Sequence, residues 1–219
     1  MEQPPTTDVF RELLDGLDLP RVPQQARSRQ KRDALLEAAG LLFAERGYEA
    51  TTADDIATAA EVSIGTFYSY FRNKRQVLLT LYATCVESID AIRIDQADFA
   101  QDQRSAIRDM ISQTLQRDAL FYGVQRAWQE LLPKDEEVAH YNALLNQILC
   151  AQILTAMRNA AAAGLTWPDL DLEKTSWIIT LLLDHNWHTM PHPDQQPVEE
   201  RERHLDALTA LVHRAVFRQ

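Results

Sequence analysis

The residues best suited to chemistry lie between positions 52 and 74. Thr66 can donate or accept a hydrogen bond, Ile64 can contact a thymine methyl group, and Gly65 allows close backbone approach to a groove wall. No Arg or Gln stands beside them for bidentate recognition of a base. We therefore expect specificity to depend partly on apolar contacts, on DNA shape, and on an arm that carries Arg27 and Arg29.

Two short helices around a tight turn would position these side chains. Thr52 and Asp55 have the spacing of a capping box, which marks the start of the first helix. Ser63 is a second N-cap candidate, and Phe67 and Phe71 lie four residues apart on the inner face of the next helix. A helix-turn-helix presents the N-terminal residues of its second helix to base edges, so this pattern predicts a DNA-reading module.

These residues resemble the TetR-type transcriptional repressors over about residues 26 to 80. The matching positions are Ile56-Ala57, residues 62–68, Tyr70-Phe71 and Asn73-Lys74. One position departs from the family pattern, because Glu61 stands where the turn usually has Gly. A left-handed backbone at Glu61 would cost roughly 1 kcal/mol, a strain that the motif can tolerate.

The resemblance implies an all-α fold, with an N-terminal three-helix helix-turn-helix domain joined to a larger helical ligand-binding and dimerisation domain. The expected divisions are an extension over 1–24, a DNA-binding domain over 25–72 and an effector domain over 73–219. The implied partners are a palindromic double-stranded DNA operator, a small-molecule effector and a second copy of the chain. The expected DNA contacts are Arg27, Arg29, Thr52, Ser63, Ile64, Gly65, Thr66, Tyr68, Tyr70 and Lys74.

Hydrophobic periodicity and helix breakers predict helices throughout the chain and no β-strand. Gly47 is the expected C-cap of the first long helix, and Asn73 the expected cap of the helix that follows the motif. A short amphipathic helix or a disordered segment is expected near residues 8–17. The other predicted helices cover 25–46, 73–94, 102–117, 119–131, 135–163, 171–190 and 197–217.

Large amphipathic rings are concentrated in the middle helices, which is typical of a pocket for a hydrophobic or aromatic ligand. Arg126 is a polar candidate there, although it can equally face solvent. For any single ring, ordinary core packing is the alternative. The predicted effector contacts are Met110, Phe121, Tyr122, Trp128, Tyr141, Leu145 and Trp177.

The last two predicted helices carry more apolar residues than one buried face requires. The helix over 171–190 is apolar on more than one side, and the helix over 197–217 has an apolar stripe. In the resembling family such helices pair with their copies in a twofold-related subunit. Core of a single chain is the alternative.

Charge is divided unevenly along the chain. The net charge of the whole sequence is −10 at pH 7. Residues 21–75 are nevertheless slightly basic, and Arg27, Arg29, Lys31 and Arg32 stand together at the start of a predicted helix, where cations oppose the helix dipole. Basic residues Lys74 and Arg75 open the next predicted helix in the same way. A DNA phosphate there would satisfy both the basic side chains of Lys74 and Arg75 and the unpaired N–H groups of that helix start.

Other classes of protein find less support. No apolar run is long enough to span a membrane and no export signal is visible, so we expect a cytoplasmic protein. Cys85 and Cys150 suggest reduced thiols, and Pro191 and Pro193 disfavour a metal site at the nearby histidines. No enzyme motif and no cofactor are expected. Two alternatives stay open: an all-α ligand-binding or enzymatic protein with an architectural helix-turn-helix, and a DNA-binding regulator without a small effector.

Overall fold

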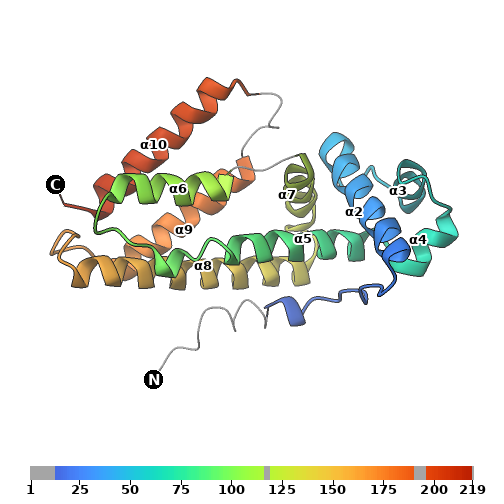
Figure 1. Ribbon diagram of the computed structural model, residues 1–219, viewed down its shortest axis with the longest axis horizontal. Coiled ribbons are helices and arrows are strands. Elements are labelled where there is room, and N and C mark those ends of the chain that lie inside the picture. Colours follow the sequence, from blue (N-terminus) through green and yellow to red (C-terminus); the bar gives the residue numbers. More distant parts are fainter. Residues whose placement is uncertain (1–12, 116–118, 190–195, 219) are drawn as a thin grey trace. The chain divides into compact units, whose positions relative to one another are not determined.

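The computed structural model describes residues 13–115, 119–189 and 196–218, and these residues are mainly α-helical (Figure 1). The all-α prediction is confirmed, since the described residues contain no strand beyond one isolated bridge between Thr166 and Phe217. No helix in this part of the chain is long and apolar enough to cross a membrane. The predicted helix near residues 8–17 lies mostly outside the described residues, although residues 13–15 are helical.

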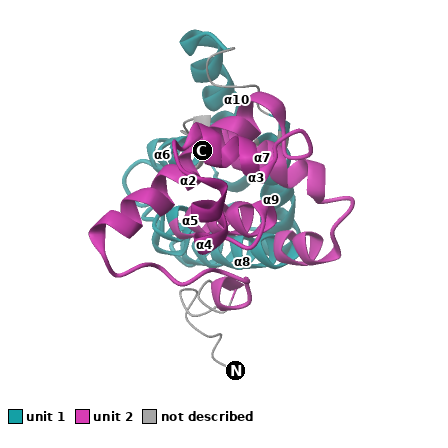
Figure 2. Ribbon diagram, turned by 90° about the vertical axis from the view of Figure 1, so that its right-hand side faces the viewer, with its two compact units in different colours: residues 1–10, 88–116, 143–219 teal, residues 11–87, 117–142 magenta. Residues whose placement is uncertain are grey.

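Contacts divide the chain into two compact units, shown in Figure 2. Among the described residues, unit 2 comprises 13–87 and 119–142, and unit 1 comprises 88–115, 143–189 and 196–218. The expected domain boundary was at 72/73. The compact unit around the helix-turn-helix extends further, because it takes in most of the next helix and also the later segment over 119–142.

Unit 2 holds the helix-turn-helix. Its helices are α2 (Ala26–Arg46), α3 (Ala53–Ala59), α4 (Ile64–Tyr70), most of α5 (Lys74–Asp90), α7 (Ala119–Leu131) and the start of α8 (Glu136–Ala162). The side chains of Leu35, Phe43, Ile56, Phe67 and Phe71 are almost fully buried in its core. The pairing of Phe67 with Phe71 is therefore confirmed, with ring centroids 6.0 Å apart.

Helices α2 and α7 approach each other closely at a pair of glycines. A Cβ atom built on Gly123 would lie 1.9 Å from the carbonyl oxygen of Gly40, so no larger residue fits at this position without moving a backbone. This contact attaches α7 to the first helix of the helix-turn-helix domain. It explains why a segment outside the expected DNA-binding domain belongs to the same compact unit.

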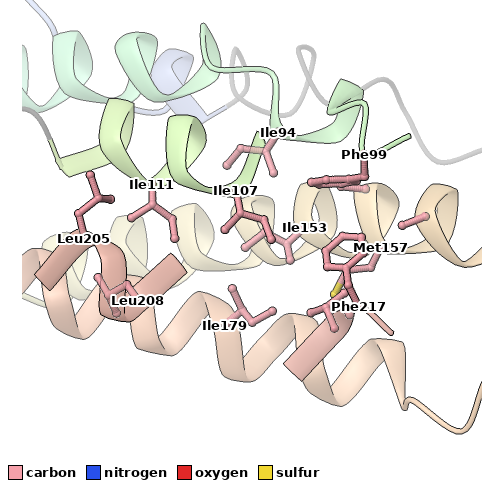
Figure 3. Close-up of a cluster of buried hydrophobic side chains, with 13 residues drawn as sticks. Ile94, Phe99, Ile107, Ile111, Ile153, Met157, Ile179, Leu205, Leu208 and Phe217 are labelled. Atoms are coloured by element: carbon pink, nitrogen blue, oxygen red, sulfur yellow. The ribbon is translucent and has the colours of Figure 1, made fainter. Parts of the chain in front are cut away.

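Unit 1 contains a 3-10 helix η1 (Ile94–Gln96), α6 (Gln103–Leu115), the rest of α8, α9 (Leu172–Thr189) and α10 (Val198–Val216). Figure 3 shows their buried apolar side chains converging: Ile107 and Ile111 from α6, Met157 from α8, Ile179 from α9 and Phe217 beyond α10. Except for α5, the predicted helix limits agree to within about two residues where the residues are described. Helix α5 ends at Asp90 and not at Ile94, because Arg93 adopts a left-handed conformation (φ 53°) and the 3-10 turn follows.

Candidate DNA-binding surface

Local hydrogen bonds build the helix-turn-helix as its sequence predicts. Thr52 Oγ1 accepts from the Asp55 backbone N–H at 3.1 Å, and an Asp55 carboxylate oxygen accepts from the Thr52 backbone N–H at 2.9 Å, so the capping box is present. Ser63 Oγ accepts from the Thr66 N–H at 3.2 Å at the start of α4. Glu61 has φ 54°, which confirms the left-handed turn.

The start of α4 presents an exposed surface with little charge. Ile64 and Tyr68 are 38% and 58% exposed, and Gly65 and Ser69 are exposed beside them. Thr66 and Tyr70 are half-buried. This face therefore combines an aliphatic group, an open backbone and a phenol, which suits contact with the methyl groups, walls and phosphates of a groove.

The hydroxyls of two predicted contacts already have partners in the protein. Thr52 Oγ1 donates to the Asp55 carboxylate at 2.6 Å, and Ser63 Oγ lies 2.9 Å from Thr66 Oγ1. Both residues are nevertheless exposed at their helix starts. Arg27 and Arg29 are also exposed, in the first turn of α2, and Arg29 Nη1 donates to the Gln24 carbonyl at 2.9 Å.

Lys74 makes contacts that its sequence position does not reveal. Its ammonium donates to the carbonyl oxygens of Tyr48 at 2.7 Å, Thr51 at 2.8 Å and Glu49 at 3.3 Å, and lies 4.3 Å from the centroid of the Tyr48 ring. Burial lowers the pKa of Lys74, whereas the carboxylates of Glu49 and Glu130 raise it. The three N–H donors of the ammonium thus hold the turn between α2 and α3.

Arg75 is also held by the protein. Its guanidinium donates to both carboxylate oxygens of Asp135, at 2.7 and 3.1 Å, and to Glu137 at 2.7 Å. These hydrogen bonds raise the pKa of Arg75 and hold the pKa of Asp135 below its usual value. The cations at the start of α5 therefore do not require a DNA phosphate, and the sequence argument from the helix dipole loses its force here.

Helix α7 also holds the end of α2 and the turn that follows it. Arg126 Nη1 donates to the carbonyl oxygens of Ala44 and Glu45 at 2.7 and 3.1 Å, and a Glu130 carboxylate oxygen accepts from the Glu49 N–H at 3.0 Å. The sequence alone leaves open whether Arg126 contacts a ligand or faces solvent. Its role at the C-terminal end of α2 has no local signal, because its partners are more than 80 residues away.

The seven residues predicted to contact an effector are divided between the units. Phe121, Tyr122, Trp128 and Tyr141 belong to unit 2, whereas Met110, Leu145 and Trp177 belong to unit 1. Trp128 is 2% exposed, stacks on Tyr82 with ring centroids 3.7 Å apart, and donates through Nε1 to Asn142 at 3.2 Å.

The remaining members of that set differ in exposure. Tyr141 is buried, and its hydroxyl lies within hydrogen-bond distance of the Gly16 carbonyl and of Glu137. Leu145 is buried, Phe121 and Tyr122 are half-buried, and Trp177 is 42% exposed.

An apolar cavity lies within unit 1, in the core shown in Figure 3. Its volume is about 60 Å³, and of the seven predicted residues Met110 lines it. The other lining residues are aliphatic or aromatic: Ile94, Phe99, Ile107, Ile111, Ile153, Ala156, Met157, Ile179, Leu183, Val212, Val216 and Phe217.

An exposed apolar stripe follows α9. Trp177, Ile178 and Leu181 are 42–63% exposed, while Ile179 on the same helix is buried in the core. Leu211 of α10 is also exposed. Helix α9 is therefore apolar on two faces, as predicted, and one of these faces is left exposed by the part of the chain that the structure describes. The histidine-rich end of α9 lies partly outside the described residues, and the described residues contain no cluster able to hold a metal ion.

Comparison with known proteins connects the helix-turn-helix to a family. Residues 35–81 match the model of the bacterial regulatory proteins of the tetR family. The chain is 44% identical over 59 residues to the HTH-type transcriptional repressor KstR2 of Mycolicibacterium smegmatis, a match that covers 27% of this chain and 28% of that protein. It is 27% identical over 207 residues to the HTH-type transcriptional regulator EthR of the same organism, over 90% of this chain and 93% of the relative.

Solved structures share the fold over most of the chain. NalD, the secondary repressor of the MexAB-OprM multidrug efflux pump in Pseudomonas aeruginosa, superposes with a TM-score of 0.69 at 18% identity and covers 89% of this chain and all of its own. The SmeT–triclosan complex superposes with a TM-score of 0.65 at 16% identity over 86% of this chain and 92% of its own. The chain covers only 38% of the Transposon Tn10 TetC protein of Escherichia coli, to which it is 36% identical, and 28% of KstR2, so these matches span well under two thirds of either relative.

Proposed function

We propose that this chain, a TetR-family transcriptional regulator, represses transcription by binding a palindromic operator as a homodimer, and that a small hydrophobic effector releases it. The observation that carries the proposal is the start of α4, where Ile64, Gly65 and Tyr68 are exposed on a helix-turn-helix whose caps and turn are complete. An architectural motif has no need of an exposed isoleucine beside an exposed tyrosine at this position.

We propose two kinds of DNA contact. Ile64, Gly65 and Thr66 face the bases, whereas Arg27, Arg29, Tyr68 and Tyr70 position the backbone, together with the exposed helix starts at Thr52 and Ser63. Lys74 stays in the proposed set only through its place at the start of α5. Its ammonium would have to leave the carbonyls of residues 48 and 51 to reach a phosphate.

The proposed dimer uses α9 and α10. The exposed apolar stripe consists of Trp177, Ile178 and Leu181. Its burial in a dimer interface would contribute about 25 cal/mol for each Å² of apolar surface removed from water. A twofold axis beside this stripe would bring it against its own copy, which is the usual arrangement of a homodimer. Twofold symmetry of the protein would then match the symmetry of a palindromic operator.

The proposed effector site is the apolar cavity of unit 1. Its lining offers hydrophobic contact and its volume of about 60 Å³ is far below the roughly 300 Å³ of pockets for drug-sized ligands. An effector of that size must therefore separate the helices around it. Helix α5 runs from Lys74 in unit 2 to Asp90 in unit 1, so a displacement at one end has a continuous helix along which to act.

Gln152 supplies a polar group near this cavity. It lies one helical turn before the cavity residue Ala156 on α8, is fully buried, and its amide N and O have no hydrogen-bond partner among the described residues. Leaving such a group unpaired costs about 1–3 kcal/mol. We therefore propose a largely apolar effector with one hydrogen-bonding group, which Gln152 would recognise.

The test begins with the operator. Duplexes selected from random sequence by the full chain give the site, and Ile64→Ala is then compared with the wild type on that site and on each single-base variant. Loss of about 1 kcal/mol or more of discrimination at one base pair in each half-site supports the proposal. The matched control is Leu41→Ala, which truncates another exposed aliphatic side chain of unit 2 and is expected to leave discrimination unchanged.

The effector arm uses the same complex. Hydrophobic compounds are screened for quenching of the four tryptophans and then for release of the operator. If an effector weakens operator binding, thermodynamic linkage requires the operator to weaken effector binding by the same free energy, typically about 1–3 kcal/mol. If an effector is found and Gln152→Leu binds it as tightly as the wild type, Gln152 is not its polar contact. A protein that binds its operator but responds to no compound would favour regulation by abundance or by a protein partner.

A further inference from the structure

We propose that Arg72 is the main phosphate anchor of the helix-turn-helix and that Asp18, in the segment before α2, competes with DNA for it. This inference rests on the proposed function. Asp18 would then act as an internal substitute for a phosphate and set how strongly the chain holds DNA of any sequence.

The first step is the charge of the motif itself. Between positions 47 and 73 the chain has four acidic residues, at 49, 54, 55 and 61, and Arg72 is its only Lys or Arg. The two cations that follow are already engaged, Lys74 with carbonyl oxygens and Arg75 with Asp135 and Glu137. Of these three cations, Arg72 therefore has the side chain that is least held by contacts within the protein.

The second step is the placement of Arg72. It follows α4 by two residues, and its side chain is 67% exposed. Its backbone is fixed, because its N–H donates to Gln76 Oε1 at 2.9 Å. An exposed guanidinium on a fixed backbone, directly beyond the helix that carries Ile64 and Tyr68, is suited to bind a phosphate beside the groove.

The third step is the carboxylate that pairs with the Arg72 guanidinium. The carboxylate of Asp18 forms an ion pair with the Arg72 guanidinium. The segment that bears it is fastened to unit 2: Leu13 and Leu17 are buried, the Gly16 carbonyl lies 2.6 Å from the Tyr141 hydroxyl, and the Asp18 carbonyl accepts from Gln76 Nε2 at 3.3 Å.

Gln76 therefore joins the two partners. Its buried amide donates to the backbone of Asp18 and accepts from the backbone of Arg72. The ion pair itself contributes little to folding, because both side chains are more than half exposed and such pairs are usually weak. Buried groups keep Asp18 beside Arg72, but because the ion pair is weak, a DNA phosphate can replace the Asp18 carboxylate on the guanidinium. Competition between the two anions requires both conditions.

The experiment measures binding of the full chain to its operator and to a duplex of random sequence, by fluorescence anisotropy over a series of KCl concentrations. Asp18→Asn is expected to tighten binding to both duplexes about two- to five-fold, since DNA no longer has to displace the carboxylate. Arg72→Gln is expected to weaken binding and to reduce the slope of log K against log salt by about 0.9, the value for one phosphate contact.

Two controls separate competition from general charge. Asp15→Asn removes the same charge from the same exposed segment, and Asp15 has no ion pair among the described residues, so little change is expected. In the double variant, Asp18→Asn is expected to have no effect once Arg72 is Gln. Melting temperatures of the wild type and of the four variants verify that each is folded.

Three results would overturn the inference: equal tightening by Asp15→Asn and Asp18→Asn, tightening by Asp18→Asn that persists without Arg72, or an unchanged salt slope in Arg72→Gln. Each of these leaves the proposed function intact, provided that the wild type binds its operator. A wild-type chain that binds neither duplex contradicts the proposed function, and this inference with it.

Discussion

Replacement of Lys74 by methionine distinguishes a structural lysine from a DNA contact. Methionine keeps most of the length of the side chain but removes the ammonium, and with it the hydrogen bonds to the carbonyls of Tyr48, Glu49 and Thr51. Hydrogen bonds that involve a charged group contribute about 1.5–3 kcal/mol, and an ammonium over an aromatic ring adds about 0.5–1 kcal/mol. Burial of the lysine, which lowers its pKa, offsets part of this gain.

We therefore expect Lys74→Met to lower the free energy of unfolding by about 2–4 kcal/mol, which corresponds to a fall in melting temperature of roughly 5–15 °C for a chain of this size. Thermal melts and urea titrations of the purified protein measure it. The control is Lys134→Met, since Lys134 forms an exposed ion pair with Glu49 at 3.0 Å and should contribute at most about 1 kcal/mol.

DNA binding by the same variants completes the test. If the Lys74 ammonium stays on its carbonyls in the complex, the salt slope of DNA binding at a temperature where Lys74→Met is folded will equal that of the wild type. A loss of stability no larger than that of Lys134→Met, together with a slope reduced by about 0.9, would refute the structural role and make Lys74 a phosphate contact.

Three further substitutions test the local physics. Glu61→Gly should raise the free energy of unfolding by roughly 1 kcal/mol, because Glu61 has φ 54°, and an unchanged melting temperature would mean that the glutamate makes a compensating contact. Gly123→Ala should lower the free energy of unfolding by about 1–3 kcal/mol, because the new Cβ would lie 1.9 Å from a carbonyl oxygen of α2. Gly65→Ala is the control and should not destabilise, because the nearest atom to its Cβ would be 3.9 Å away. Equal melting temperatures of the two variants would argue against the close contact. Asp135→Asn should lower the free energy of unfolding by about 1–3 kcal/mol at pH 7. Arg75 holds the pKa of Asp135 in the folded state below its usual value of 3.8, so the unfolded state binds more protons just below about pH 4. The difference in stability from the wild type should therefore disappear as the pH falls through the folded pKa. A difference that persists undiminished in acid would exclude the ion pair as its cause.

The parts of the fold that were predictable from the sequence depend on neighbours within a few residues. The capping box at Thr52 and the cap at Ser63 each involve partners three residues apart, and the left-handed turn at Glu61 is closed by hydrogen bonds that span at most five residues. Helix limits followed from the same kind of signal, and they failed at the end of α5, where Arg93 turns left-handed without a Gly or Pro to announce it.

The site was less predictable because its charges pair over long distances in the chain. Arg75 and Asp135 are 60 residues apart, and Arg126 reaches carbonyls about 80 residues away. From sequence alone, a cation at a helix start indicates only that some anion or acceptor is required. The protein itself supplies the acceptors for Lys74 and Arg75, because the start of α5 packs against the turn between α2 and α3 and against the start of α8.

The cavity was hidden for a related reason. Aromatic residues drew the prediction toward Trp128, whose ring fills its own space by stacking on Tyr82. The cavity is lined instead mainly by aliphatic residues from several elements, each of which has the spacing of ordinary core. A void arises where such side chains fail to meet, and no periodicity in one segment records that.

The most direct test of the central claim is selection of DNA from a random library by the full-length chain, followed by sequencing. A dimer that reads two major grooves with α4 is expected to enrich a palindrome with half-site centres about 10 base pairs apart, or a multiple of that spacing. Ile64→Ala should relax one position in each half-site of the same palindrome. Enrichment of no motif above the starting library by the folded wild-type protein would contradict the account.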